Sequence, residues 1–196
     1  MKIIGLTGGI ASGKTTITKL LKKRNLIVHD SDFVVGGLYS KPKKNFLDYL
    51  KKITLGRSIK NNAVDKNIIR EEIFNNIKKR KLLEKYIHLE VKKNRELFLK
   101  KHKKKKTKIV FLDIPLLFEK KLEKQCDNTI LLYSPLKLRK QRALKRAGMQ
   151  KKILEKIIKS QLSDKIKKAK TDFVVNTSKN KNKSLNEILK IVKLIT

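Results

Sequence analysis

The chain has 196 residues, enough for one domain with a substantial core or for one domain with an inserted lobe. Its single cysteine, Cys126, excludes an internal disulfide, and no spacing of Cys and His is typical of a zinc site. No apolar stretch approaches the roughly 18 residues that a membrane span needs, and the chain starts directly with strand-like residues. We therefore expect a cytoplasmic protein with no membrane partner.

The formal charge is +35, from 52 Lys and Arg against 17 Asp and Glu. A charge of this size is typical of proteins that bind nucleic acids. The lysines, however, are spread over the whole length among many Asn and Ile, aromatic residues are few, and Trp is absent, so stacking on bases is not indicated. We interpret the charge as a compositional bias without a specific nucleic-acid partner, although such a field still attracts polyanionic ligands.

The first elements in the chain predict a strand, a loop and a helix. Residues 3–7 are a short apolar run, and residues 14–23 have helical spacing. Between them, Gly8 to Thr15 match the phosphate-binding pattern G-x-x-x-x-G-K-[ST]. Its glycines let backbone N–H groups and the helix N-terminus surround a phosphate, Lys14 adds a positive charge, and the Thr15 hydroxyl can ligate Mg²⁺. A Gly-rich turn that binds nothing is the alternative, and the strand, loop and helix order favours the phosphate site.

The middle of the chain predicts a lobe made of helices. Residues 26–29 should form a second strand, followed by Asp30-Ser31-Asp32 and a helix that starts at residues 33–39. From 41 to 103 the apolar residues have helical spacing without a convincing strand, which predicts a helical lobe inserted after the second strand. The lysine-rich run at 100–108 then enters the third strand from the side away from the phosphate loop. We interpret it as a solvated turn, with an RNA or membrane contact as the alternative.

The last part of the chain returns to alternating strands and helices. Strands are predicted at 109–112, 129–133 and 173–175, and helices at 135–146, 151–168 and from Ser184 onward, with Ser134 as the cap of the first. Apolar strands that alternate with helices indicate an α/β fold with a parallel sheet of about five strands, flanked by helices. We expect a single domain whose nucleotide-binding core comprises 1–40 and 104–196. The inserted lobe would comprise 41–103 and a helical lid about 139–165.

Several charged residues should meet beyond the C-terminal strand ends, where ligands bind in such sheets. Asp32 can orient and deprotonate an attacking hydroxyl, with Asp30 as a competitor and helix capping as the alternative role. Asp113, at the end of the third strand, can hold Mg²⁺ through water on positional grounds. Arg139, Arg142 and Arg146 share a helix face by their spacing, which predicts a mobile lid or, alternatively, a solvated arginine face.

Together these residues resemble the dephospho-coenzyme A kinase family. The resemblance covers nearly the whole chain in the right order, and the Pro115 to Glu119 stretch is more specific than the phosphate loop alone. The stretches that carry it are residues 5–15, Asp30-Ser31-Asp32, Ile73-Phe74, residues 113–119, Arg142 with Arg146, Gln161 and residues 169–176. Departures are Asn61-Asn62 and Lys66 where the family often has Asp-Gly and an arginine, Leu89 in place of a proline after His88, and Ala11 in place of a loop glycine.

The resemblance implies a P-loop NTPase-type kinase that uses ATP and Mg²⁺ to phosphorylate the 3′-hydroxyl of the ribose in dephospho-coenzyme A. It implies catalytic roles for Asp32, Arg142 and Arg146. The phosphate-loop pattern adds a catalytic role for Lys14 and a metal ligand at Thr15, and the position of Asp113 adds a second metal-binding residue. The residues that the resemblance assigns to ATP are Gly8, Gly9, Ala11, Ser12, Gly13, Lys14, Thr15, Thr16 and Asn176. Those that it assigns to the acceptor are Asp32, Phe74, His88, Pro115, Leu116 and Leu117.

Two other interpretations remain open from the sequence. A different small-molecule P-loop kinase, such as one acting on nucleoside monophosphates, would have a similar loop and lid, so the acceptor decides between them. A nucleotide-gated RNA-binding protein would explain the charge, but it needs clustered aromatic residues or a basic face near the ligand, and neither is visible. We expect a monomer or a weak homo-oligomer.

Overall fold

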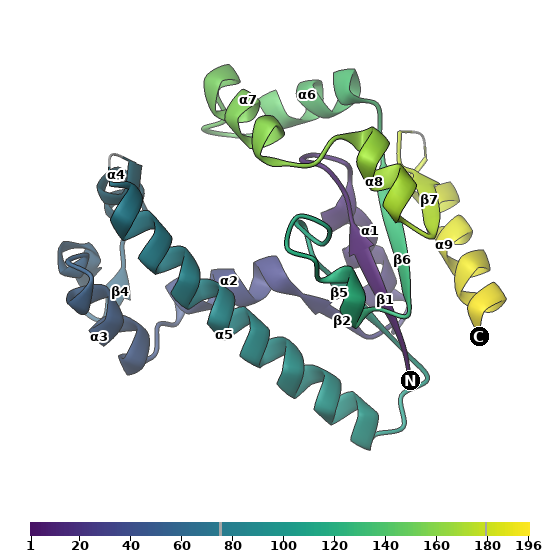
Figure 1. The fold of residues 1–196 in the computed structure, drawn as a ribbon, viewed down its shortest axis with the longest axis horizontal. Helices are drawn as coiled ribbons and strands as arrows, with labels where there is room; N and C mark the ends of the chain where they lie inside the picture. Colours follow the sequence, from purple (N-terminus) through teal and green to yellow (C-terminus); the bar gives the residue numbers. More distant parts are fainter. Residues whose placement is uncertain (75, 179) are drawn as a thin grey trace. The chain divides into compact units, whose positions relative to one another are not determined.

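The computed structural model describes residues 1–74, 76–178 and 180–196 (Figure 1). The chain divides into two compact units: unit 1 comprises Met1–Asp30 and His102–Thr196, and unit 2 comprises Ser31–Lys101. Residues 31–40, which the sequence analysis grouped with the core, therefore belong to unit 2. Among the described helices, none is both long enough and apolar enough to cross a membrane.

The described residues of unit 1 form a five-stranded parallel sheet in the order β2-β5-β1-β6-β7. Central strand β1 pairs with β5 on one side and β6 on the other, so that Leu6 lies opposite both Asp113 and Ile130. The α/β prediction with about five parallel strands is thereby confirmed. The strands are β1 (Lys2–Thr7), β2 (Val28–Asp30), β5 (Ile109–Asp113), β6 (Asn128–Tyr133) and β7 (Phe173–Asn176).

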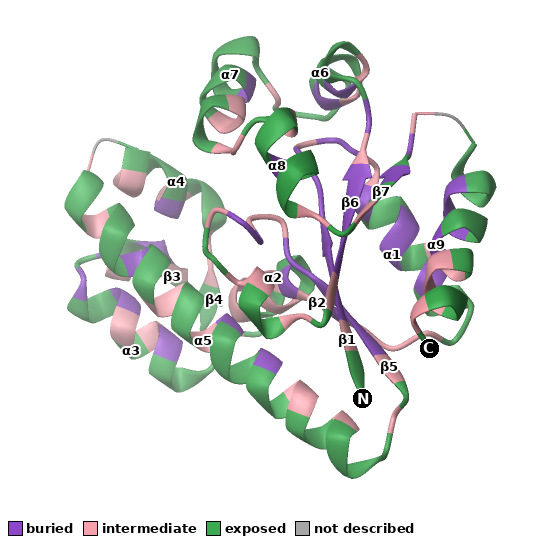
Figure 2. Cartoon of the chain, turned by 45° about the vertical axis from the view of Figure 1, so that its right-hand side comes forward, coloured by how far each residue is buried: buried purple, intermediate pink, exposed green. Residues whose placement is uncertain are grey.

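The core of unit 1 holds the start of the chain in place. Alternate residues Ile4 and Leu6 of β1 are fully buried in a cluster with α1 (Lys14–Lys23) and α9 (Lys181–Ile195). On the opposite face, Gly5 lies against the side chains of Leu117 and Cys126. Figure 2 shows the buried residues concentrated in the central strands. The end of β1 and the beginning of α1 are therefore anchored on both sides.

The helices after β6 differ from the prediction in two ways. The single helix expected at 151–168 is two helices, α7 (Lys151–Ser160) and α8 (Asp164–Lys170), because Ser163 caps α8 and accepts a hydrogen bond from the Ile166 N–H at 3.3 Å. Helix α6 (Leu136–Leu144) ends before Arg146, and its N-cap is Pro135 instead of the expected Ser134. A short 3₁₀ helix, η2 (Glu123–Gln125), precedes β6.

Unit 2 is mainly helical, as expected, but it also contains a small hairpin. Strands β3 (Ile59–Lys60) and β4 (Ala63–Val64) are antiparallel, so the expectation of a lobe without strands was wrong here. Asn61 and Asn62 both have positive φ, 48° and 58°, as the two central residues of a type I′ hairpin turn require. The helices are α2 (Ser31–Ser40), α3 (Lys44–Lys52), η1 (Gly56–Ser58), α4 (Lys66–Phe74) and α5 (Ile77–Lys104).

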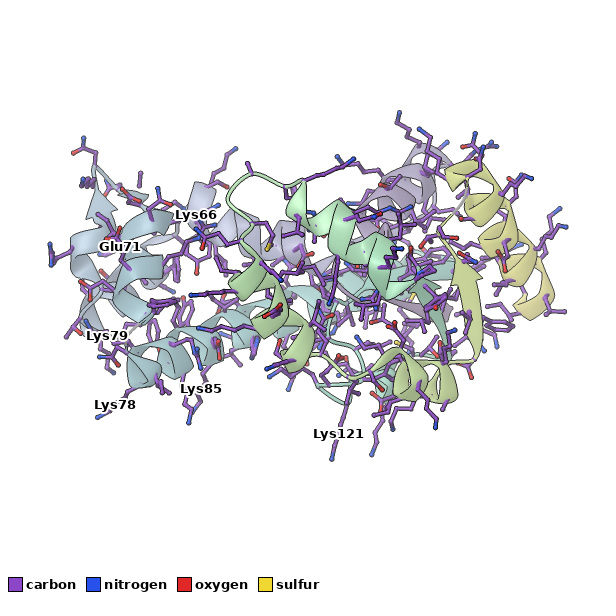
Figure 3. All side chains as sticks on the ribbon, turned by 90° about the horizontal axis from the view of Figure 1, so that it is seen from above. Lys66, Glu71, Lys78, Lys79, Lys85 and Lys121 are labelled. Atoms are coloured by element: carbon purple, nitrogen blue, oxygen red, sulfur yellow. The ribbon has the colours of Figure 1, made fainter. Side chains whose placement is uncertain are left out.

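The core of unit 2 is aromatic at its centre. Phe46 is buried, its ring lies 5.5 Å from that of Tyr39 and 5.4 Å from that of Tyr86, and Tyr49 stacks on Tyr86 at 4.3 Å. Burial raises the pKa of both Tyr39 and Tyr86. The surface of this unit is basic: Figure 3 shows labelled lysines such as Lys78 and Lys85 projecting from α5. Unit 2 thus has a core of its own, separate from the sheet.

Candidate active site

The phosphate loop connects β1 to α1 in a conformation that its glycines permit. Gly13, the N-cap of α1, has a φ of 87°. A Cβ on Gly8 would lie 2.4 Å from Ser12 Oγ and 2.7 Å from the Leu132 carbonyl oxygen, so the loop packs tightly on the end of β6. Ala11 also has a positive φ, 57°, a conformation that costs a non-glycine residue roughly 1–2 kcal/mol. The replacement of a loop glycine at this position therefore carries strain, which the sequence analysis did not foresee.

Lys14 is nearly buried and forms an ion pair with Asp113 at the end of β5. The other carboxylate oxygen, Oδ2, accepts a hydrogen bond from Thr18 Oγ1 at 2.6 Å. Thr18 lies one helical turn after Lys14, so α1 supplies donors to both oxygens of Asp113. A carboxylate held by two protein donors is oriented firmly, and it can reach a metal ion through water more readily than as a direct ligand.

A pocket of about 110 Å³ lies beside the loop within unit 1. Thr16, on the exposed start of α1, contributes to its lining, and Thr15 is also exposed there. The pocket therefore continues from the phosphate loop toward the loop after β7. Its lining residues are Gly13, Thr16, Ile17, Arg142, Thr177, Lys181 and Ser184.

The loop after β7 is fastened to the phosphate loop through Thr177. Its Oγ1 lies 2.5 Å from the Ser12 carbonyl oxygen, and its N–H donates to the Tyr133 carbonyl at 2.7 Å. The Asn176 side chain accepts a hydrogen bond from the Ser178 N–H at 2.9 Å and so shapes the same loop. Lys179, within the predicted polar loop 176–182, lies outside the described residues.

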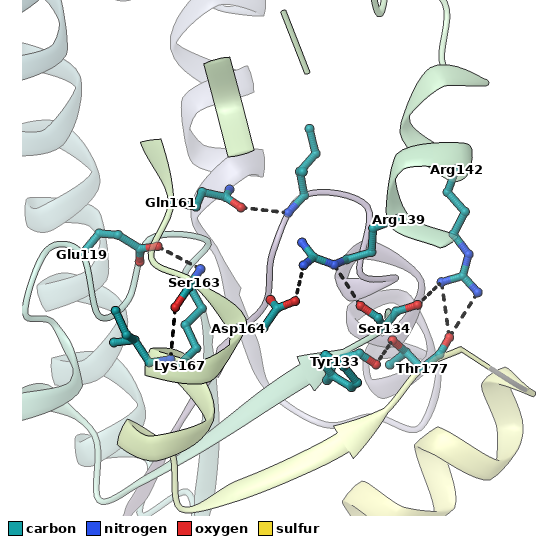
Figure 4. Close-up of polar contacts among 12 residues, drawn as sticks. Glu119, Tyr133, Ser134, Arg139, Arg142, Gln161, Ser163, Asp164, Lys167 and Thr177 are labelled. Atoms are coloured by element: carbon teal, nitrogen blue, oxygen red, sulfur yellow. Dashed lines mark hydrogen bonds and ion pairs between the residues drawn. The ribbon is translucent and has the colours of Figure 1, made fainter. Parts of the chain in front are cut away.

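The three arginines predicted to share a lid face have different surroundings, and Figure 4 shows two of them, Arg139 and Arg142. Arg142 donates to the Thr177 carbonyl at 3.2 and 3.3 Å, which places its guanidinium at the pocket wall. Arg139 is buried and ion-paired with Asp164. Arg146 lies beyond the end of α6 and is exposed. The expectation of one arginine face on one helix was therefore wrong, because α6 ends at Leu144, before Arg146, and because Arg139 and Arg142 bind different partners.

The segment after β5 runs past the end of β1. The Ile114 N–H donates to the Leu6 carbonyl at 3.0 Å, and Thr7 Oγ1 donates to the Pro115 carbonyl at 3.1 Å. Pro115 and Leu116 are half-buried, whereas Leu117 is completely buried beneath Gly5. Pro115, Leu116 and Leu117 were all assigned to the acceptor. Leu117 packs against Gly5 in the core and has no exposed surface with which to contact a substrate.

The remaining predicted site residues belong to unit 2. Asp32 is the second residue of α2, Phe74 ends α4 with 71% of its surface exposed, and His88 lies on an exposed position of α5. Their roles stay predictions. Asp30, the other candidate base, ends β2 and forms a 3.1 Å ion pair with Lys22 near the end of α1.

Comparison with known proteins supplies the assignment. The family model described as dephospho-CoA kinase matches residues 2–183. The chain belongs to the dephospho-CoA kinase family. A dephospho-CoA kinase of Bartonella henselae is 34% identical over 194 residues, which covers 98% of this chain and 97% of that protein. Among solved structures, a Thermus thermophilus protein has a TM-score of 0.79 at 28% identity, covering 98% of this chain and 96% of its own. A dephospho-CoA kinase from Campylobacter jejuni has a TM-score of 0.71 at 23% identity, and the match covers 100% of this chain and 98% of that one. At this identity the match shows a similar fold.

Two residues at the site of this kinase were missed by sequence reasoning. Thr18 had a detectable signal, because it follows Lys14 by four residues and therefore lies on the same face of α1. Thr177 had none, because its contact with Ser12 joins residues 165 positions apart. Such a contact depends on the order of strands in the sheet.

Proposed function

We propose that the chain transfers the γ-phosphoryl group of ATP to the 3′-hydroxyl of the ribose of dephospho-coenzyme A, giving coenzyme A and ADP. The observation that carries this proposal is the phosphate loop with the oriented set of Lys14, Asp113 and Thr18, in a chain that belongs to the dephospho-CoA kinase family. Phosphoryl transfer depends mainly on positioning and on neutralising charge, which is what these residues provide.

The donor side follows from unit 1. Backbone N–H groups between Gly8 and Thr16 and the N-terminus of α1 would hold the triphosphate, and the Lys14 ammonium would turn from Asp113 toward the phosphates. The pocket beside Gly13 would receive the adenine, near Asn176. There the planar guanidinium of Arg142 can stack on the base, a role that its position supports better than contact with the transferred phosphoryl group.

The residues at the loop fit a Mg²⁺ ion bound together with ATP. Thr15 places an exposed hydroxyl at the start of α1, and Asp113 offers a fixed carboxylate for a bridging water. Mg²⁺ keeps several waters and takes few protein ligands, so this small donor set suffices. The ion would neutralise charge on the phosphates.

The acceptor side rests on fewer contacts. Asp32 would orient the ribose hydroxyl and take its proton, and the exposed Arg146 would stabilise charge on the transferred group from the lid. Phe74, His88, Pro115 and Leu116 would contact the acceptor. We propose that the enzyme works in the cytoplasm as a monomer or weak homo-oligomer, with ATP and dephospho-coenzyme A as substrates and no specific nucleic-acid or membrane partner.

Purified protein with MgATP tests the proposal directly. We expect ADP release that depends on dephospho-coenzyme A, with coenzyme A identified as the product by mass spectrometry. ADP release with a nucleoside monophosphate and none with dephospho-coenzyme A would overturn the proposal. Added RNA should not change the rate of ADP release with either acceptor. Any RNA that binds at low salt should dissociate when the salt concentration is raised moderately.

A further inference from the structure

The turn between α7 and α8 is connected to three separate parts of unit 1 (Figure 4). Gln161 Oε1 accepts a hydrogen bond from the Ile10 N–H of the phosphate loop at 3.0 Å. The Leu162 N–H donates to Glu119 at 2.9 Å, in the segment after β5. Asp164 binds Arg139 of α6, with Nη2 and Oδ2 separated by 2.5 Å. Three residues within the stretch 161–164 therefore join the loop, the segment after β5 and helix α6.

Arg139 is the most constrained member of this set. It is 5% exposed, its Nε donates to the Ser134 carbonyl at 2.9 Å, and its Nη2 pairs with Asp164. A planar guanidinium that is bonded in two directions cannot rotate without breaking one of the bonds. Asp164, whose side chain is half-buried, neutralises its charge, so the ion pair acts as a rigid support.

This support lies directly against Gly9 of the phosphate loop. A Cβ on Gly9 would lie 2.0 Å from Arg139 Nη1 and 2.9 Å from its Cζ. Among the described glycines, positive φ occurs at Gly13 and Gly148, so backbone conformation does not require a glycine at position 9. The Arg139 guanidinium, in the position that it occupies, leaves no room for a side chain on residue 9. Since the next N–H, that of Ile10, is held by Gln161, the Gly9-Ile10 step is fixed from both sides by the same turn.

We propose that Arg139, held by Asp164, is a positioning residue that fixes the Gly9-Ile10 part of the phosphate loop in the shape that binds the triphosphate. Arg139 affects ATP binding through the backbone of the phosphate loop. Its positive charge is neutralised by Asp164 and does not act on the triphosphate. A loop that is ordered in advance binds its ligand without the cost of ordering, so loss of this support weakens ATP binding. The inference rests on the proposed function only in that the loop binds ATP.

Calorimetric binding of MgATP without any acceptor tests the role of Arg139. We expect Arg139→Ala to weaken binding about tenfold. Arg139→Lys should lose as much, because a lysine keeps the charge but not the two-directional bonding. The matched control is Arg24→Ala, an exposed arginine of the same unit, whose affinity should equal that of the unchanged protein. Full affinity in Arg139→Lys would overturn the proposal, since charge alone would then suffice.

A double-mutant cycle tests the contact with Gly9 itself. Gly9→Ala alone should weaken MgATP binding at least as much as Arg139→Ala, because the new methyl group displaces the guanidinium. Combined with Arg139→Ala, it should add little further loss, because the atoms that it displaces are gone. Fully additive losses would overturn the proposal and show that the phosphate itself requires Gly9.

Two further measurements distinguish a role of Arg139 in supporting the loop from a general role in folding and from a role in turnover. If Arg139→Ala shows no cooperative thermal unfolding, Asp164→Asn replaces it in the binding assay. Several-fold weaker MgATP binding then supports the proposal, and unchanged affinity overturns it.

Steady-state kinetics with dephospho-coenzyme A provide the second measurement. The KM for ATP should rise in Arg139→Ala while kcat changes little. Because the binding assay uses no acceptor, failure of the proposed turnover would leave its result intact.

Discussion

Unit 1 buries its aliphatic residues between a parallel sheet and helices, whereas unit 2 packs helices around an aromatic cluster. In unit 1, Ile4 and Leu6 are fully buried, and the strand ends converge on the phosphate loop. In unit 2, Phe33 and Phe74 are 76% and 71% exposed. The phosphate loop therefore belongs to the unit with the parallel sheet. In the proposed function, the donor nucleotide binds to this unit, and unit 2 contributes Asp32, Phe74 and His88 to the acceptor.

The largest effect is expected at Asp32, which belongs to unit 2. Asp32→Asn should lower kcat by about 10²–10⁴-fold, the range for loss of a positioned general base. The affinity for MgATP without acceptor should not change, because the loop that binds it lies in unit 1. Asp30→Asn is the matched control and should keep most of the turnover. Comparable loss of kcat in both variants would contradict the assignment of Asp32.

The two cores can be compared by equivalent cavities. Leu21→Ala in unit 1 and Leu50→Ala in unit 2 each remove a completely buried leucine, and each should destabilise its unit by about 2–5 kcal/mol. Calorimetry should resolve two transitions, each substitution lowering one of them. MgATP at 100 times its Kd should recover about 2.7 kcal/mol in the transition of unit 1 and leave the other unchanged. A single transition lowered equally by both would show that the units unfold as one.

A smaller effect is expected from the support of Asp113 by α1. Thr18→Val keeps the shape but removes the hydroxyl, leaving Asp113 Oδ2 buried without that donor. The unfolding free energy of unit 1 should fall by about 1–3 kcal/mol, and binding of MgATP should weaken as Asp113 loses its orientation. Urea denaturation and calorimetry measure both. Thr196→Val, at the last residue, is the control; unchanged stability and affinity in Thr18→Val would show that Lys14 alone orients Asp113.

The smallest effect concerns a surface carboxylate in unit 2. A hydrogen bond from Lys79, at 2.8 Å, lowers the pKa of Glu72 from its ordinary value of 4.5. A lowered pKa in the folded state means that Glu72 stabilises unit 2 above pH 4.5 and that this contribution is lost as the pH falls through the folded pKa.

Glu72→Gln should therefore lower the stability of unit 2 slightly at pH 7 and leave it unchanged at a pH well below 4. Urea denaturation at the two pH values measures the difference. Glu96→Gln, whose carboxylate lies 3.8 Å from Lys92 on the exposed face of α5, serves as the control. A cost for Glu72→Gln that is equal at both pH values would mean that packing, and not the charge, is responsible.

The sheet and the phosphate loop could be predicted closely because their signals are local. Apolar runs marked the strands, and the sequence from Gly8 to Thr15 specified the loop, although the strain at Ala11 was visible only in its φ of 57°. The hairpin of unit 2 was missed although Asn61-Asn62 is a recognisable type I′ turn, because two-residue strands leave no apolar alternation to read. The 151–168 helix was predicted too long because the Ser163 cap interrupts a continuous helical pattern.

The sequence by itself determined the family, the donor loop and the α/β class, because backbone conformation and alternation of apolar residues depend on neighbours in the chain. Only the tertiary structure decided the partners of the charged groups. Arg139 and Asp164 are 25 residues apart, and Lys14 and Asp113 are 99 apart. Their meeting depends on which strands lie side by side and on where α6 and α8 begin. A guanidinium that lies against Gly9 therefore could not be read from the spacing of arginines along one helix.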